Sequence, residues 1–141
     1  MGAGIAFVTA QAGIDVVLID RDQEAADKGK AHSEELITKA VKRGRASEEQ
    51  KEKLLSKINA TADYDALADC DLVIEAVFED REIKKTVTEK AEAVMKSRAI
   101  FASNTSTLPI TSLAQASKRP KNFIGIHFFS PVDKMMLVEV I

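Results

Sequence analysis

Residues 99–131, AIFASNTSTLPITSLAQASKRPKNFIGIHFFSP, decide the fold class of this chain. Within them, the short apolar run 99–102 predicts a buried strand, 110–117 a short helix, and 122–127 a second strand. A strand, a helix and another strand in this order form a βαβ unit, whose two strands run parallel. The stretch therefore predicts a parallel sheet with helices packed against it.

The rest of the chain repeats this alternation of strands and helices. We expect strands at 15–20, 58–62 and 72–77, and helices at 1–12, 23–44, 47–57 and 81–97. The two helices within 23–57 are strongly charged and predict a helical hairpin that projects from the sheet. The sequence thus predicts an α/β fold, a Rossmann-like doubly wound parallel sheet with a helical hairpin insertion. The N-terminal strand is expected to be missing, because the first helix opens at Met1.

Composition limits the classes of function. The 141 residues suit one domain, and their net charge of −2 disfavours nucleic-acid binding. No apolar run approaches the roughly 20 residues of a membrane span, and no signal peptide is visible. Because Cys70 is the only cysteine, an internal disulfide is excluded. We expect Cys70 to be a small buried residue. Because the two histidines lie far apart, we expect no metal site.

Polar residues follow the expected strands at their carboxyl ends, where ligands bind in such sheets. They are Asp20, Glu79, the loop 103–107 and the segment 127–131. The loop SNTST at 103–107 suits ligand binding, although a helix-capping turn before Ile110 is the alternative. His32 lies among charged residues of the hairpin, so we expect it to be solvated.

His127 and Glu139 form the strongest catalytic candidate. In the run 136–141, strand alternation places Glu139 on a face with apolar neighbours. A charge in an apolar environment needs a partner, and His127 is the obvious one. A His–Glu pair in a dry site would make a proton acceptor that works near neutral pH. The alternative is a structural histidine that is hydrogen-bonded to the backbone.

Asp20 and Gly2 suit a dinucleotide. An acid at the end of the strand 15–20 is placed to accept hydrogen bonds from the adenosine ribose, which favours NAD over NADP. Arg21 weakens this preference, because an arginine could bind a 2′-phosphate, and an ordinary turn residue is the alternative for Asp20. Gly2 opens the first helix, but the glycine fingerprint before it is incomplete.

Three strings closely resemble the NAD-binding domain of the L-3-hydroxyacyl-CoA dehydrogenase family. They are DLVIEAVFEDREIKK at 71–85, IFASNTSTLPI at 100–110 and GIHFFSPVDKMMLVEVI at 125–141, and the likeness runs over essentially the whole chain. The variant HFFSP and the following PVDKM are most similar to the dehydrogenase part of multifunctional fatty-acid oxidation α-subunits. The resemblance implies that residues 1–141 are one NAD-binding domain.

The resemblance also implies roles for individual residues. His127 would be the catalytic base, Glu139 its orienting partner, and Ser106 a hydrogen-bond partner of the substrate oxygen close to the nicotinamide. The residues implied to bind NAD are Gly2, Asp20, Glu79, Lys84, Ser106 and Ser130. Ser130 stands where many members have asparagine, and Gly2 matches only the third glycine of the fingerprint.

The implied reaction is oxidation of a 3-hydroxyacyl-CoA to a 3-ketoacyl-CoA with NAD in fatty acid β-oxidation. The family's first strand and its helical C-terminal domain have no counterpart here, so we expect the 141 residues alone to be inactive. We expect a homo-oligomer or membership of a fatty-acid oxidation complex, located in the cytoplasm of a bacterium or in a eukaryotic mitochondrion or peroxisome. The alternatives are a nucleotide-binding module or a structural relative without catalysis, and a dehydrogenase that acts on a hydroxy acid lacking CoA.

Overall fold

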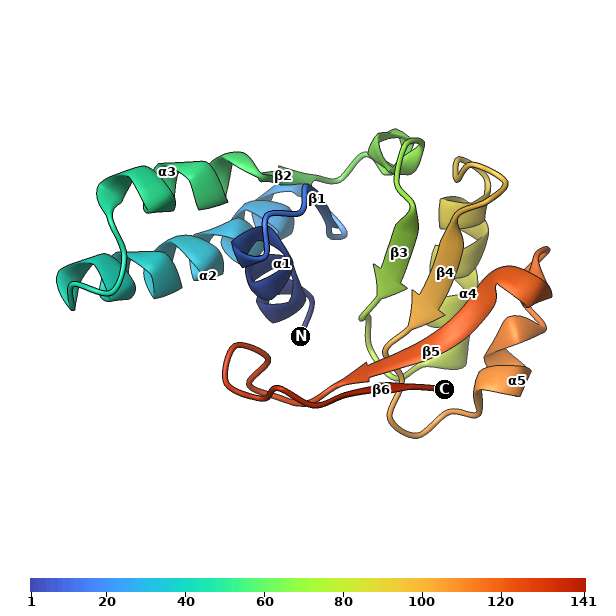
Figure 1. The fold of residues 1–141 in the computed structure, drawn as a ribbon. Helices are drawn as coiled ribbons and strands as arrows, with labels where there is room; N and C mark the ends of the chain where they lie inside the picture. Colours follow the sequence, from blue (N-terminus) through green and yellow to red (C-terminus); the bar gives the residue numbers. More distant parts are fainter. The chain divides into compact units, whose positions relative to one another are not determined.

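The computed structural model describes residues 1–141 as an α/β fold of two compact units (Figure 1). The first unit comprises Met1–Asp63 with Ser130–Lys134, and the second comprises Tyr64–Phe129 with Met135–Ile141. The strands and helices alternate as the sequence predicts, and the Rossmann-like α/β class is confirmed. No helix has the length and apolar character that crossing a lipid bilayer requires.

The first unit is built on a pair of parallel strands. Its elements are α1 (Gly2–Gln11), β1 (Val16–Ile19), α2 (Gln23–Lys42), α3 (Glu48–Ser56) and β2 (Ile58–Thr61). β1 and β2 pair in parallel, with Val16 opposite Ile58. Gly13 follows α1 with φ +88°, a left-handed conformation that glycine adopts without steric cost, so the chain can turn into β1.

The helices of the hairpin begin at caps that the sequence encodes locally. The Asp22 carboxylate accepts the N–H of Ala25 at 2.8 Å at the start of α2. The Ser47 hydroxyl accepts the N–H of Gln50 at 3.1 Å, and the Gln50 side chain accepts the N–H of Ser47 at 2.8 Å. This reciprocal pair is a capping box, and it satisfies two backbone donors that have no partner within the helix.

The helical hairpin α2–α3 is not polar throughout. Its buried residues Ile37 and Leu54 pack with Phe7 of α1 and Ile58 of β2. An apolar stripe therefore joins the base of the hairpin to the unit's core, while its far end extends away from β1 and β2 (Figure 1). As predicted, His32 is exposed on this hairpin.

The second unit holds a four-stranded sheet in the order β3-β4-β5-β6. Its elements are β3 (Leu72–Glu75), α4 (Arg81–Glu92), β4 (Ile100–Ser103), α5 (Ile110–Ala114), β5 (Phe123–Phe128) and β6 (Val138–Val140), with short 3₁₀ turns at Tyr64–Leu67 and Pro120–Asn122. The strands β3, β4 and β5 are parallel, and Phe101 stacks on Phe123 with ring centres 5.4 Å apart in the core. Cys70 is half-buried rather than fully buried, because it lies in the turn before β3.

Two features of this unit differ from the sequence prediction. β6 pairs with β5 in the antiparallel sense, since the connection 129–137 is too short for the crossover that parallel strands need. α4 ends at Glu92, several residues before the expected end. There the Arg119 guanidinium donates to the carbonyls of Glu92, Met95 and Lys96 and so satisfies the end of the helix.

Candidate active site

The candidate site of the second unit lies at the carboxyl ends of its parallel strands. Glu79 follows β3, the loop with Ser106 follows β4, and His127 lies near the end of β5. Because these strands are neighbours and point the same way, their following loops meet at one edge of the sheet. The sequence prediction for these three segments is therefore confirmed as to their place in the fold.

His127 and Glu139 face each other across the antiparallel pair β5–β6. They are directly opposed in register, and His127 Nδ1 lies 3.1 Å from Glu139 Oε2. A hydrogen bond from Nδ1–H to the carboxylate leaves the lone pair on Nε2, which can then accept a proton. The Phe129 ring makes an edge contact with the imidazole, at 4.7 Å between ring centres. The carboxylate and the phenyl ring thus restrict the imidazole from two directions.

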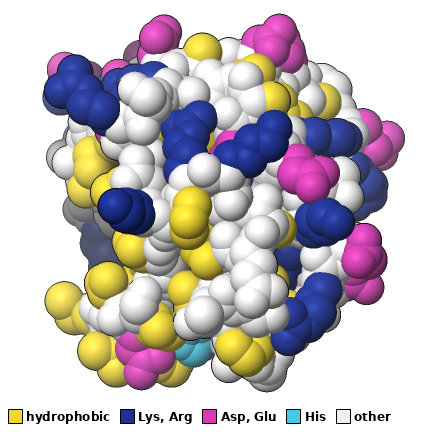
Figure 2. All heavy atoms as spheres, turned by 90° about the vertical axis from the view of Figure 1, so that its right-hand side faces the viewer, with side chains coloured by type: hydrophobic (Ala, Val, Ile, Leu, Met, Phe, Trp, Pro, Cys, Tyr) yellow, Lys and Arg dark blue, Asp and Glu magenta, His cyan; other side chains and the backbone are white.

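The prediction that Glu139 points into an apolar environment is wrong for this structure. Its side chain is 51% exposed, against 20% for His127. β6 is the edge strand of the sheet, and all three of its residues are exposed. The alternating pattern of residues 136–141 indicates which side chains share a face of the strand. It does not indicate whether anything packs on that face. Leu137, Val140 and Ile141, all within two residues of Glu139 in the chain, are exposed apolar residues. Figure 2 shows hydrophobic side chains on the surface at the lower left of its view.

Glu79 organises the loop that carries Ser106. Its Oε2 accepts hydrogen bonds from the backbone N–H of Ser106 at 2.9 Å and of Thr107 at 3.2 Å. The hydroxyls of the same two residues donate to it at 3.1 Å each. Burial acts to raise the pKa of Glu79, but these loop hydrogen bonds and the Lys84 cation outweigh it and lower the pKa to about 2. Glu79 is therefore ionised near neutral pH, and its carboxylate holds the backbone of the Ser106 loop by hydrogen bonds.

Lys84 contacts Glu79, and its own side chain is buried. Its ammonium is 2.5 Å and 2.8 Å from the two oxygens of Glu75, and 3.3 Å from Glu79. The Ser103 hydroxyl donates to Glu75 at 3.1 Å, so the pair also reaches the start of the Ser106 loop. Burial raises the pKa of Glu75, against the opposing effects of Lys84 and Ser103. Our sequence reasoning missed Glu75, although an acid at the end of the apolar run LVIE could have marked a buried partner.

The remaining candidate residues belong to the first unit. Asp20 is exposed directly after β1, and one of its oxygens accepts the N–H of Arg21 at 2.8 Å. The Arg21 guanidinium lies 3.6 Å from the Asp22 carboxylate, which competes with any anion for that charge. Gly2 is the first residue of α1, whose opening N–H groups have no side-chain cap. Ser130 is exposed. An acid after β1 and an uncapped helix start fit the ribose and phosphates of a dinucleotide. The roles of these three residues stay predictions.

The fold and the sheet-edge site define a Rossmann-like nucleotide-binding class, and comparisons narrow it. Residues 1–141 match the family described as 3-hydroxyacyl-CoA dehydrogenase, NAD binding domain. A probable 3-hydroxybutyryl-CoA dehydrogenase of Deinococcus radiodurans is 47% identical over the whole chain, which covers 50% of that protein. A fatty acid oxidation complex subunit alpha of Psychrobacter cryohalolentis is 43% identical, with 20% of its length covered.

Solved structures agree with this result. (S)-3-hydroxybutyryl-CoA dehydrogenase from Ralstonia eutropha matches 99% of the chain with a TM-score of 0.95 and 37% identity, over 50% of its own length. The Escherichia coli 3-hydroxybutyryl-CoA dehydrogenase matches 99% of the chain with a TM-score of 0.94 and 38% identity, over 30% of its own length. The chain belongs to the 3-hydroxyacyl-CoA dehydrogenase family as its NAD-binding domain, as the motifs predicted. It spans half or less of the length of these relatives.

Proposed function

We propose that the whole protein oxidises an L-3-hydroxyacyl-CoA to the 3-ketoacyl-CoA with NAD. The observation that carries this proposal is the His127–Glu139 contact of 3.1 Å. It lies at the sheet edge from which the Ser106 loop also extends. Two relatives, named as a probable 3-hydroxybutyryl-CoA dehydrogenase and a fatty acid oxidation complex subunit alpha, support this substrate class. Bound NAD supplies the acceptor for the hydride that leaves the hydroxyl-bearing carbon.

His127 acts as the general base in this proposal. As the hydride leaves, the developing carbonyl must release its hydroxyl proton, which Nε2 of His127 accepts. Glu139 holds the Nδ1 proton and stabilises the imidazolium that results. The Ser106 hydroxyl, which donates to Glu79 at 3.1 Å in this structure, turns to donate its hydrogen bond to the same substrate oxygen. Proton transfer to a positioned base of this kind is worth on the order of 10²–10⁴ in rate.

The residues proposed for NAD are those that the family resemblance implies. Asp20 accepts hydrogen bonds from the adenosine ribose hydroxyls, and the α1 start at Gly2 binds the diphosphate. Glu79, Lys84, Ser106 and Ser130 are proposed for the nicotinamide half. Lys84 has the least freedom among them, because its side chain is 3% exposed and already paired.

The chain alone is proposed to be inactive. The relatives named above that act on hydroxybutyryl-CoA are about twice as long or longer, which supports a site completed by further residues. Association into a homo-oligomer or a fatty-acid oxidation complex is proposed from the α-subunit relatives. A cytoplasmic location is proposed because the relatives described above are bacterial.

Reduction of acetoacetyl-CoA by NADH in the full-length protein tests the proposed function. We expect turnover with acetoacetyl-CoA and much weaker turnover with free acetoacetate. Equal rates with both substrates would point to a hydroxy acid dehydrogenase that ignores CoA. NADH binding without turnover of either would make the protein a nucleotide-binding module and would refute the proposal.

A further inference from the structure

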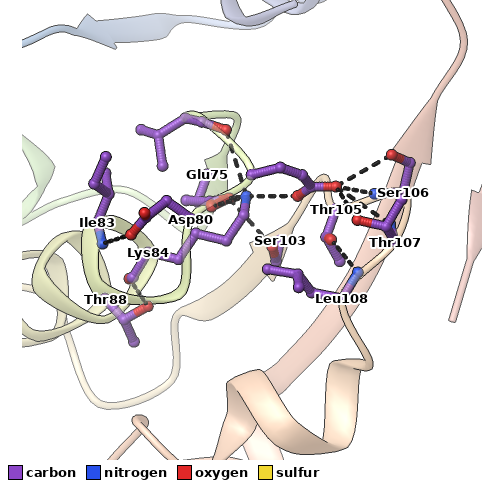
Figure 3. A network of polar contacts seen from close by, with 12 residues as sticks. Glu75, Asp80, Ile83, Lys84, Thr88, Ser103, Thr105, Ser106, Thr107 and Leu108 are labelled. Carbon is purple, nitrogen blue, oxygen red and sulfur yellow. Dashed lines mark hydrogen bonds and ion pairs between the residues drawn. The ribbon is translucent and has the colours of Figure 1, made fainter.

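The most buried charges of the chain are Glu75 and Lys84, whose side chains are 1% and 3% exposed. Their contacts of 2.5 Å and 2.8 Å tie both carboxylate oxygens to one ammonium (Figure 3). Removing two charges from water costs several kcal/mol per ion, and a pair of apolar residues often stabilises a fold as well or better. Stability alone therefore gives a weak reason for this pair.

The pair is connected to the Ser106 loop by two routes. Lys84 lies 3.3 Å from Glu79, whose other oxygen accepts four hydrogen bonds from Ser106 and Thr107. Glu75 also holds the first residues of the same loop directly. Its carboxylate accepts from the Ser103 hydroxyl at 3.1 Å, and its carbonyl accepts the N–H of Asn104 at 2.8 Å.

We propose that Glu75 is a positioning residue, which fixes Lys84 and through it the Glu79 carboxylate that orients Ser106. This inference rests on the proposed function, in which Ser106 contacts the substrate oxygen. Lys84 sits between two carboxylates and balances only one of them. Without the Glu75 charge, Lys84 pairs with Glu79 alone and draws it away from the loop donors. Ser106 then loses the acceptor that holds both its N–H and its hydroxyl.

Two variants of the full-length protein separate positioning from stability. Glu75→Gln keeps the shape but leaves the Lys84 cation without its partner, so it lowers both the melting temperature and kcat. Glu75→Gln/Lys84→Met removes both buried charges and should regain much of the melting temperature. It leaves Glu79 without the Lys84 cation, so kcat should stay about 10- to 100-fold low, as expected for a misplaced site group.

The control is Glu92→Gln. Glu92 is a second buried glutamate of the same unit, and its carboxylate accepts hydrogen bonds from the Ser117 hydroxyl and the Lys118 N–H, which lie outside the Ser106 loop. It should lower the melting temperature and leave kcat unchanged. Recovery of both melting temperature and kcat in the double variant would show that Glu75 serves stability only and would overturn the proposal.

Hydrogen exchange in a peptide that covers 103–108 reads the same inference without any turnover. Both Glu75 variants should speed exchange at the N–H groups of Ser106 and Thr107, and Glu92→Gln should not. The variants could show this exchange pattern even if the wild type turned over no substrate. In that case the proposed function would be refuted, and the inference that Glu75 positions the loop would hold. Unchanged exchange in the Glu75 variants would contradict the inference, whatever the activity.

Discussion

The side-chain oxygen of Asn104 accepts the backbone N–H of Phe128 at 2.8 Å, and so ties the loop after β4 to the residue next to His127. The ladder between β4 and β5 ends at Ser103 and Gly125, so this bond continues the connection beyond the last paired residues. It joins the segment that carries Ser106 to the segment that carries His127. We expect this bond to help set the distance between the proposed base and the proposed hydroxyl donor.

We therefore expect Asn104→Ala to lower kcat in the full-length protein and the free energy of unfolding by about 1 kcal/mol, the usual worth of one hydrogen bond. Asn122→Ala is the matched control, because Asn122 donates from its amide to the Ser97 carbonyl at 3.2 Å, away from the site. It should show a similar or smaller stability loss with normal kcat. Equal kcat in the two variants would mean that the Asn104 bond does not set the site geometry.

The charge on Glu79 should stabilise the fold above its ordinary pKa and lose that effect in acid. Its pKa in the folded state is about 2, below the ordinary 4.5, so folding favours the ionised form. Glu79→Gln should therefore unfold at lower denaturant than the wild type near pH 7. The difference should shrink as the pH falls from about 4.5 to about 2. A difference that stays constant over this range would show that the charge of Glu79 is not what stabilises the loop.

Asp20 should set the preference for NADH over NADPH. Its exposed carboxylate would accept hydrogen bonds from the ribose hydroxyls and would repel a 2′-phosphate. We expect Asp20→Ala to weaken NADH binding and to narrow the preference, both measured by titration of the full-length protein. Asp15→Ala is the control, since Asp15 is also an exposed acid, precedes β1 and pairs with Lys57. Tighter binding of NADPH than NADH by the wild type would contradict the assignment of Asp20.

Gly125 allows α5 and the C-terminal residue to pack against β5. A Cβ at this position would lie 2.7 Å from Ile110 Cδ1 and 3.1 Å from Ile141 Cβ. Gly125→Ala should lower the free energy of unfolding by about 1–3 kcal/mol, as overpacking does. Adding Ile110→Val removes the nearest atom and should recover part of this loss in denaturant unfolding. No recovery in the double variant would place the strain elsewhere.

Features set by neighbouring residues could be predicted from the sequence. The capping box of Ser47 and Gln50 and the glycine turn at Gly13 need only a few adjacent positions. The strand ends that place Glu79, Ser106 and His127 follow from short apolar runs. The resemblance added the roles of these residues, which no local pattern contains.

Features set by tertiary packing were missed. The burial of Lys84 and its pairing with Glu75 depend on how α4 lies on β3, and the Asn104–Phe128 bond depends on the parallel pairing of β4 and β5. The exposure of Glu139 follows from the position of β6 at the sheet edge, which alternation cannot reveal. Sequence periodicity reports which residues share a face, whereas burial depends on what covers that face.

The central claim is tested most directly by measuring kcat for acetoacetyl-CoA reduction. The variants are His127→Gln, Glu139→Gln and the double variant, each with NADH affinity unchanged. Glutamine keeps a hydrogen-bonding side chain at 127 but cannot take part in the proton transfer, so kcat should fall by on the order of 10²–10⁴. Glu139→Gln should lower kcat, because it removes the carboxylate that holds the Nδ1 proton and stabilises the imidazolium. Because the two residues act as one unit, the double variant should be scarcely slower than His127→Gln. Near-normal turnover by His127→Gln, or losses that multiply independently, would contradict the His–Glu mechanism and leave His127 a structural residue of β5.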